Sequence, residues 1–193
     1  MFANYHTHTA RCHHATGEDK AYVEAAIQNG FQVLGFSDHC PWIFSDGYVS
    51  SIRMTPDELD GYVTSLTALK KEYAADITIY IGLESEYVPE MLPEQQKFLQ
   101  DYPIDYQILG EHFLYPEQRG IYTGRPTDDA AELKHYVDQV IAGMETGNYL
   151  YLAHPDLFHF IGDSALYEQE FRRLCVYLKE KQIPIEINQL GLT

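Results

Sequence analysis

The chain has 193 residues, a length that suits one domain and is sufficient to bury a sizeable core. It carries 13 Lys and Arg residues against 29 Asp and Glu residues, and the net charge of −16 opposes nonspecific binding to nucleic acid or to an anionic membrane. No apolar run approaches the length of a membrane span, and the start lacks the pattern of a signal peptide, so we expect a cytoplasmic protein. Three widely spaced cysteines imply no disulfide framework.

Short apolar segments alternate with segments of helical periodicity along the whole chain. Residues of β-branched and aromatic type predict strands at 2–8, 31–39, 77–87, 106–113, 149–155 and 183–189. Apolar residues at helical spacing predict helices at 18–30, 55–74, 92–102, 128–147 and 163–182, and the last of these is expected to pack Cys175 into the core. Six strands alternating with five helices predict an α/β domain with a parallel sheet.

Imidazole and carboxylate groups recur at the ends of the predicted strands. His6 and His8 occupy alternate positions of the first strand, so we expect them to share a face. The carboxyl ends of parallel strands form one rim of a barrel, and groups placed there converge although they are scattered in sequence. The strand-end groups of the next four strands are Asp38 and His39, Glu84 and Glu86, Glu111 and His112, and His154 and Asp156.

Neutral imidazole and carboxylate are ligands that zinc, manganese and iron prefer, and several histidines with a shared acid suit a site for two or more divalent ions. Glu84 is the candidate for the shared carboxylate, and the chemistry that follows is hydrolysis by a metal-activated water. A single histidine pair is more often structural than metal-binding, but repetition at five strand ends favours a metal site. Of the adjacent His13 and His14, we expect His14 to point inward. We place His135 on a helix surface and leave the roles of His159 and Glu86 open.

An ordered set of motifs carries a resemblance to a known family. The set comprises "YHTHT" at 5–9, a histidine six positions after His8, "FSDH" at 36–39, "GLESEY" at 82–87, "GEHF" at 110–113, a histidine after the fifth strand and "EINQLGL" at 186–192. Together they resemble the PHP (polymerase and histidinol phosphatase) superfamily, nearest its histidinol-phosphatase branch. The resemblance implies one distorted (β/α)7 barrel domain over residues 1–193, with a trinuclear metal centre that hydrolyses phosphate esters.

Carried over by position, the resemblance implies a role for particular residues. His6, His8 and Glu84 would hold one metal ion, and Glu84, His112 and His154 a second. His14 and His39 would contribute to a third ion. The catalytic groups would be Glu84 and His112, acting through a metal-bound hydroxide. Substrate-binding roles fall to Arg53, Arg125 and Asn188, the first two as phosphate-binding cations in loops and the last as a residue that lines the pocket.

The sequence departs from the family pattern at its end. The family places a further strand with an Asp-x-His motif after "EINQLGL", whereas this chain stops at Thr193. The strand at 183–189 would be left as an apolar edge and the barrel could not close. We therefore expect an incomplete barrel, either a fragment of a longer protein, a chain completed by a partner, or a natural truncation.

The function expected from these features is hydrolysis of a small phosphomonoester, with histidinol phosphate as the substrate that the resemblance implies. One alternative keeps the metal ions and changes the substrate, to phosphotyrosine on proteins or to a nucleotide. Another alternative, from a different class, is a metal-binding module without catalytic activity.

Overall fold

The structure is a computed structural model, and it describes residues 3–187. Contacts within the chain define two compact units, which are described separately. The first unit comprises the residues up to Glu84 together with Pro89–Gln107. The second unit comprises Ser85–Val88 and the residues from Ile108 onward.

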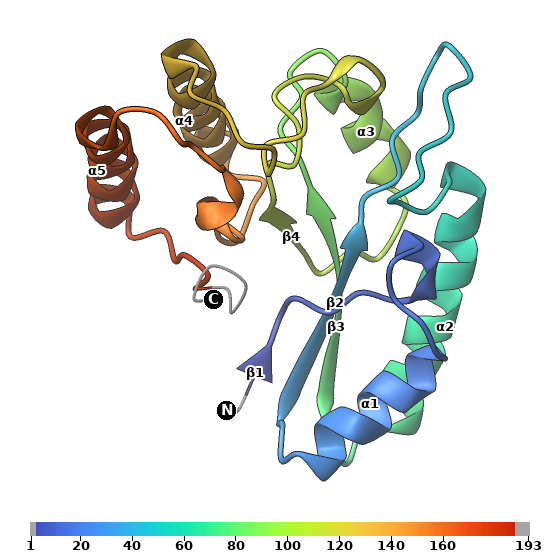
Figure 1. Ribbon diagram of the computed structural model, residues 1–193. Helices are drawn as coiled ribbons and strands as arrows, with labels where there is room; N and C mark the ends of the chain where they lie inside the picture. Colours follow the sequence, from blue (N-terminus) through green and yellow to red (C-terminus); the bar gives the residue numbers. More distant parts are fainter. Residues whose placement is uncertain (1–2, 188–193) are drawn as a thin grey trace. The chain divides into compact units, whose positions relative to one another are not determined.

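The fold is α/β, with a curled half-barrel of four strands in the order β1-β2-β3-β4 (Figure 1). Strand β1 pairs with β2 and β2 with β3, both in parallel. The strands are β1 (Ala3–Asn4), β2 (Val33–His39), β3 (Thr78–Ser85) and β4 (Tyr106–Leu109), and the helices of the first unit are α1 (Asp19–Gln28), α2 (Leu59–Glu72) and α3 (Leu92–Leu99). Helices α1 and α2 lie next to each other along the sheet (Figure 1).

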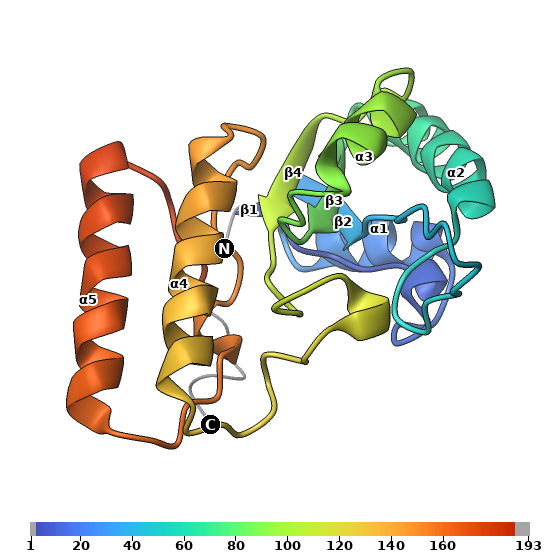
Figure 2. The same cartoon turned by 90° about the horizontal axis from the view of Figure 1, so that it is seen from above.

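The second unit is built around helices α4 (Ala130–Glu145) and α5 (Ser164–Lys181), which lie side by side (Figure 2). Asp129 and Asp163 begin these helices, and each aspartate side chain accepts a hydrogen bond from a backbone N–H of the first turn. The core between the helices includes Leu133, Val137 and Leu174. Single bridges join Leu109 to Leu152 and Leu152 to Ile185 in parallel.

Side chains alternate between the two faces of β2 and β3. Leu34 and Phe36 of β2 share a core with Ile79 and Ile81 of β3 and with the apolar sides of the three helices. The opposite face has glycines at the centre, and Tyr106 packs over Gly35 and Gly82, where any Cβ atom would collide with its ring or hydroxyl. The tyrosine thus fills the space that the two glycines leave.

All five predicted helices are confirmed, each within a few residues of its expected bounds. The first strand is shorter than predicted because the side chain of Asn4 accepts from the N–H of His6 (2.8 Å) and donates to Oγ1 of Thr7 (3.0 Å), which turns the chain out of the strand. The predicted strand at 149–155 and the described part, 183–187, of the strand predicted at 183–189 are reduced to the single bridges, and residues 188–189 lie outside the described part of the chain. Within the described residues, no helix is long and apolar enough to cross a membrane.

The prediction that Cys175 packs in the core is wrong, because this thiol is exposed on α5. The buried face of α5 runs through Glu170, Leu174 and Leu178 at intervals of one turn, and Cys175 lies one position off that line. Cys12 and Cys40 are the buried cysteines.

Candidate metal centre

A buried carboxylate lies beside an imidazole where β2 and β3 end. The parallel register pairs His39 with Glu84, so both side chains leave the same face at the same level. Nδ1 of His39 lies 3.1 Å from Oε2 of Glu84. Only 1% of the Glu84 side chain is exposed, so its charge is held away from bulk solvent. A carboxylate in this position needs positive partners nearby.

Two further imidazoles approach the same oxygen of Glu84. Nε2 of His6 lies 3.3 Å from Oε2, and Nε2 of His8 lies 3.4 Å from it. The two Nε2 atoms are 3.1 Å apart. These histidines follow β1 rather than lying in it, and the carbonyl of Thr7 between them accepts a 2.9 Å hydrogen bond from the N–H of Ser37. That bond keeps the segment alongside β2.

Asp38 holds the loop that carries His8. Its Oδ1 accepts from the N–H of Thr9 at 2.6 Å, and its Oδ2 accepts from the hydroxyl of Thr9. The same Oδ1 is 3.5 Å from Nδ1 of His8, on the side of the ring away from Nε2. A carboxylate behind an imidazole fixes the orientation in which the ring presents its other nitrogen.

The surroundings of His8 favour positive charge. Burial of the ring lowers its pKa, but hydrogen bonds to Asp38, Cys12 and Glu84 outweigh burial and raise the pKa to about 12. Burial lowers the pKa of His14, and the neighbouring His8 lowers it further. This part of the first unit therefore favours cationic charge at His8.

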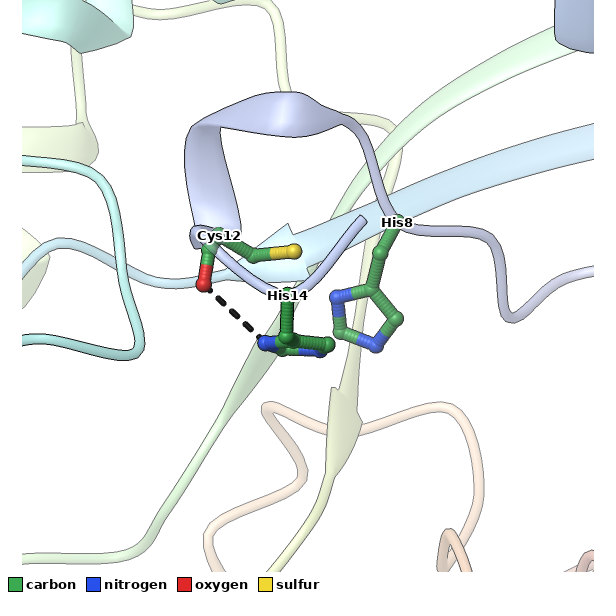
Figure 3. A group of neighbouring side chains, drawn as sticks. All are labelled: His8, Cys12 and His14. Carbon is green, nitrogen blue, oxygen red and sulfur yellow. Dashed lines mark hydrogen bonds between the residues drawn. The ribbon is translucent and has the colours of Figure 1, made fainter. Parts of the chain in front are cut away.

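His14 reaches the cluster through a tight turn. The short helix η1 (Ala10–Cys12) is followed by His13 in a left-handed conformation, with φ of 64°. The turn places Nδ1 of His14 3.0 Å from the carbonyl oxygen of Cys12. The ring of His14 lies beside that of His8, with 4.9 Å between centroids (Figure 3). Its centroid is 5.2 Å from that of His39.

These side chains fit a divalent cation. His8, His39 and Glu84 offer three ligand atoms that lie within 4.8 Å of one another. Imidazole nitrogen and carboxylate oxygen are donors that zinc, manganese and iron accept, and the positive charge of an ion would offset the buried carboxylate. The first unit therefore holds a candidate metal-binding cluster, defined by His6, His8, His14, His39 and Glu84.

The second unit presents a smaller group of the same chemistry. Nδ1 of His112 is 3.0 Å from Oε1 of Glu86, and both side chains are largely buried. The ring of His154 lies 5.0 Å from that of His112, centroid to centroid. His154 has a positive φ of 26°, and its N–H donates to Oε2 of Glu186 at 3.0 Å. Glu86 thus has a defined partner, where the sequence left its role open.

Both carboxylate oxygens of Glu111 accept hydrogen bonds from other residues of the second unit. Its Oε1 accepts from the N–H of Tyr87 at 2.7 Å, and its Oε2 accepts from the side-chain amide of Gln139 at 2.9 Å. Burial raises the pKa of Glu111 well above its usual range, and the charge of Glu86 raises it further. Glu111 thus links the segment that follows β3 to α4 within the second unit.

The family model of the PHP domain matches residues 4–190. The chain belongs to the PHP-domain family. Membership places it among metal-dependent phosphoesterases, and the histidine and carboxylate groups of the chain fit that chemistry. The PHP domain expected from the sequence is therefore confirmed.

Solved structures share the fold of this PHP domain at low sequence identity. The candidate histidinol phosphatase hisK from Listeria monocytogenes aligns with a TM-score of 0.74 and 22% identity, over 95% of this chain and 80% of that one. The histidinol phosphate phosphatase HISK from Lactococcus lactis, complexed with zinc, L-histidinol and phosphate, aligns with a TM-score of 0.73 and 20% identity, over 97% and 73%. No curated protein matches the sequence significantly. The predicted PHP-type fold, an incomplete barrel, is confirmed.

The three residues predicted to bind substrate differ in their surroundings. Arg53 is 1% exposed, and its guanidinium donates at 3.0 Å to the carbonyl oxygen of Cys40, the residue that follows His39, so it is a buried cation. Arg125 lies in the second unit and pairs with Glu132 at 2.5 Å. Asn188 lies outside the described residues.

The remaining histidines of this PHP domain do not belong to the candidate metal-binding cluster. His13 is exposed, as expected, and His159 is exposed as well. His135 is partly buried, with Nε2 2.9 Å from the carbonyl oxygen of Leu114, so the expectation of a plain helix-surface residue is only partly right. Sequence reasoning did not assign Cys12 a role, although its spacing from His8 and His14 was the available signal.

Proposed function

We propose that this PHP domain hydrolyses a phosphomonoester with the help of two to three bound divalent metal ions. The observation that carries the proposal is the convergence of His6, His8 and His39 on one buried oxygen of Glu84, at distances of 3.1 to 3.4 Å. A structural core has no need of three imidazoles around one carboxylate, whereas a cation site does. Because the family match spans both units, we propose that they serve one PHP domain.

The proposed ligands are those that the family pattern assigns. In the first unit they are His6, His8, His14, His39 and Glu84, and in the second unit His112 and His154. A bound ion would supply a Lewis acid for the phosphoryl oxygens and lower the pKa of a water molecule. The protein's own part is to present the ligands: Asp38 lies behind His8, and Glu86 bonds the ring nitrogen Nδ1 of His112.

The proposed substrate is histidinol phosphate. The complex of the Lactococcus lactis relative with zinc, L-histidinol and phosphate supports this choice, as does the acidic character of the chain, which suits a substrate with a cationic amine. We propose that Arg53, Arg125 and Asn188 contact the phosphate or the pocket, as the family pattern suggests.

The test combines metal analysis with kinetics on one preparation. Chelator-treated protein is reloaded with zinc, manganese or iron, the bound metal is counted, and hydrolysis of histidinol phosphate is followed beside a phosphotyrosine peptide and a nucleoside monophosphate. We expect more than one equivalent of metal and turnover that requires it.

The possible results distinguish an error in the proposed substrate from an error in the proposed enzymatic function. Metal-dependent turnover of another phosphoester, without turnover of histidinol phosphate, would revise the substrate alone. A well-folded protein that binds no metal and hydrolyses no phosphomonoester would refute the enzymatic function.

A further inference from the structure

Cys12 lies inside the histidine cluster of the first unit, and the metal centre proposed above makes no use of it. The residue is completely buried, and its thiol donates to the carbonyl oxygen of Thr9 at 3.0 Å. Ligand atoms of His8, Cys12 and His14 all lie within 4.8 Å of one another. Cysteine sulfur and imidazole nitrogen are both ligand atoms that zinc binds in proteins.

The backbone brings the three side chains together. The N–H of Cys12 donates to the carbonyl of Thr9 at 3.2 Å, and the N–H of His13 donates to that of Ala10 at 3.2 Å, closing the turn of η1. His13 then takes a left-handed conformation that few non-glycine residues adopt. The chain reverses there, so that His14 returns to the side of the turn on which Cys12 and His8 lie. Backbone strain of this kind is kept where the surrounding structure requires it.

His8 offers its two ring nitrogens in two directions. Nε2 faces Glu84 at 3.4 Å. Nδ1 is buried and lies 3.5 Å from Oδ1 of Asp38, a long contact that does not reach hydrogen-bond geometry. Figure 3 shows a ring nitrogen of His8 turned toward the side chain of Cys12, with His14 below the turn. A ring nitrogen with only a long contact to a carboxylate remains a candidate metal ligand.

We propose that Cys12, His8 and His14 form a zinc site with a sulfur ligand. Binding exchanges the thiol proton for the metal ion, and the thiol no longer donates to Thr9. A thiolate is a soft donor, so the site favours zinc and cadmium over manganese. The site shares His8 and His14 with the metal centre proposed above, and it deepens that proposal by naming a residue that selects the metal. It does not require that the protein hydrolyse any phosphoester.

The other two cysteines provide matched controls. Cys40 is buried in the first unit, and its sulfur accepts from the side-chain amide of Gln95 at 3.1 Å. Cys175 is exposed on α5. Neither belongs to a group of candidate ligands within the described part of the chain.

The experiment measures sulfur coordination directly in the full chain. X-ray absorption at the zinc edge is recorded for the zinc-loaded protein, and ultraviolet absorption is followed during titration with cadmium. We expect a zinc–sulfur distance of about 2.3 Å and a thiolate-to-cadmium band. In Cys12→Ser both signals disappear, and they persist in Cys40→Ser and Cys175→Ser. Cys12→Ala is the second variant, and circular dichroism checks the folding of each.

Affinity gives a second readout. Replacement of Cys12 by serine should weaken cadmium binding by more than about tenfold, since even groups that only support a ligand contribute about that much. Manganese binding should change by less than about threefold, because this ion prefers oxygen and nitrogen. If the wild-type protein binds zinc without any sulfur signal, the thiolate site is wrong and the proposed phosphatase centre stands. If the sulfur signal is present but no phosphoester is hydrolysed, the site stands and the phosphatase function fails.

Discussion

The hydroxyl of Tyr106 donates a 2.7 Å hydrogen bond to the backbone carbonyl of Tyr5, a residue 101 positions earlier in the chain. It also bonds the carbonyl oxygen of Phe36, at 3.0 Å. Tyr5 directly precedes His6, so the first residue of β4 fixes the backbone that carries the histidine pair. The contact links the packing of the first unit to the placement of its candidate ligands.

Replacing Tyr106 by phenylalanine removes these bonds and keeps the ring over the glycines. We expect the free energy of unfolding to fall by about 1 to 3 kcal/mol, because buried carbonyls lose their donor. Urea denaturation measures the change. Tyr22→Phe is the control, since that hydroxyl bonds the carbonyl of Thr16 at the surface. An equal decrease in the free energy of unfolding in the two variants would show that the Tyr106 hydrogen bonds stabilise the fold no more than a surface bond does.

A methyl group at Gly82 should be costly. Its Cβ would collide with the ring of Tyr106, and overpacking of this kind costs about 1 to 3 kcal/mol of unfolding free energy. Gly61→Ala in α2 is the matched control, because no atom lies within 4 Å of the added methyl group. That change should stabilise the helix by about 0.5 to 1 kcal/mol. Thermal and urea unfolding measure whether each change raises or lowers the free energy of unfolding. A stabilised Gly82→Ala would contradict the packing described.

Glu84→Gln tests the shared carboxylate with little change in shape. The amide lacks the charge that an ion needs, so we expect at least one equivalent of metal to be lost. The kcat/KM for the phosphoester should fall by about a hundredfold or more, which corresponds to about 3 kcal/mol. Elemental analysis and steady-state kinetics measure these effects. Glu94→Gln on the exposed side of α3 is the control. Full metal content with lost activity would argue against a ligand role for Glu84.

Asp138 on α4 joins α5 through an ion pair, with Arg173 Nη2 2.8 Å from its Oδ1. Burial raises the pKa of Asp138, but hydrogen bonds from Lys134 and Arg173 outweigh burial and lower it. An aspartate with a lowered folded-state pKa stabilises the fold above its unfolded-state pKa of about 3.9, and this stabilisation is lost as the pH falls through the folded-state pKa.

Because the Asp138 side chain is 43% exposed, solvent screens the pair, and Asp138→Asn should cost less than about 1 kcal/mol at neutral pH. Unfolding curves at neutral pH and below the folded-state pKa measure the difference between the two proteins. A difference that grows as the pH falls would contradict the assigned sign.

The sequence by itself determined the five helices, the alternation with strands and the list of histidines and carboxylates at strand ends. These features depend on neighbours within a few turns, because helical periodicity and capping are local. The sequence also placed His39 and Glu84 at the ends of neighbouring strands, but it did not predict that they pair, which the register of β2 and β3 decides.

Only the tertiary structure decided where β1 ends, which thiols are buried and what Arg53 touches. Asn4 ends β1 through bonds to the following residues, and Arg53 is buried against the carbonyl of Cys40 although it lies in a long loop. His14 returns to the side of Cys12 because His13 reverses the chain in a left-handed conformation. These outcomes depend on packing between residues far apart in sequence and on one backbone angle, which residue type and spacing leave open.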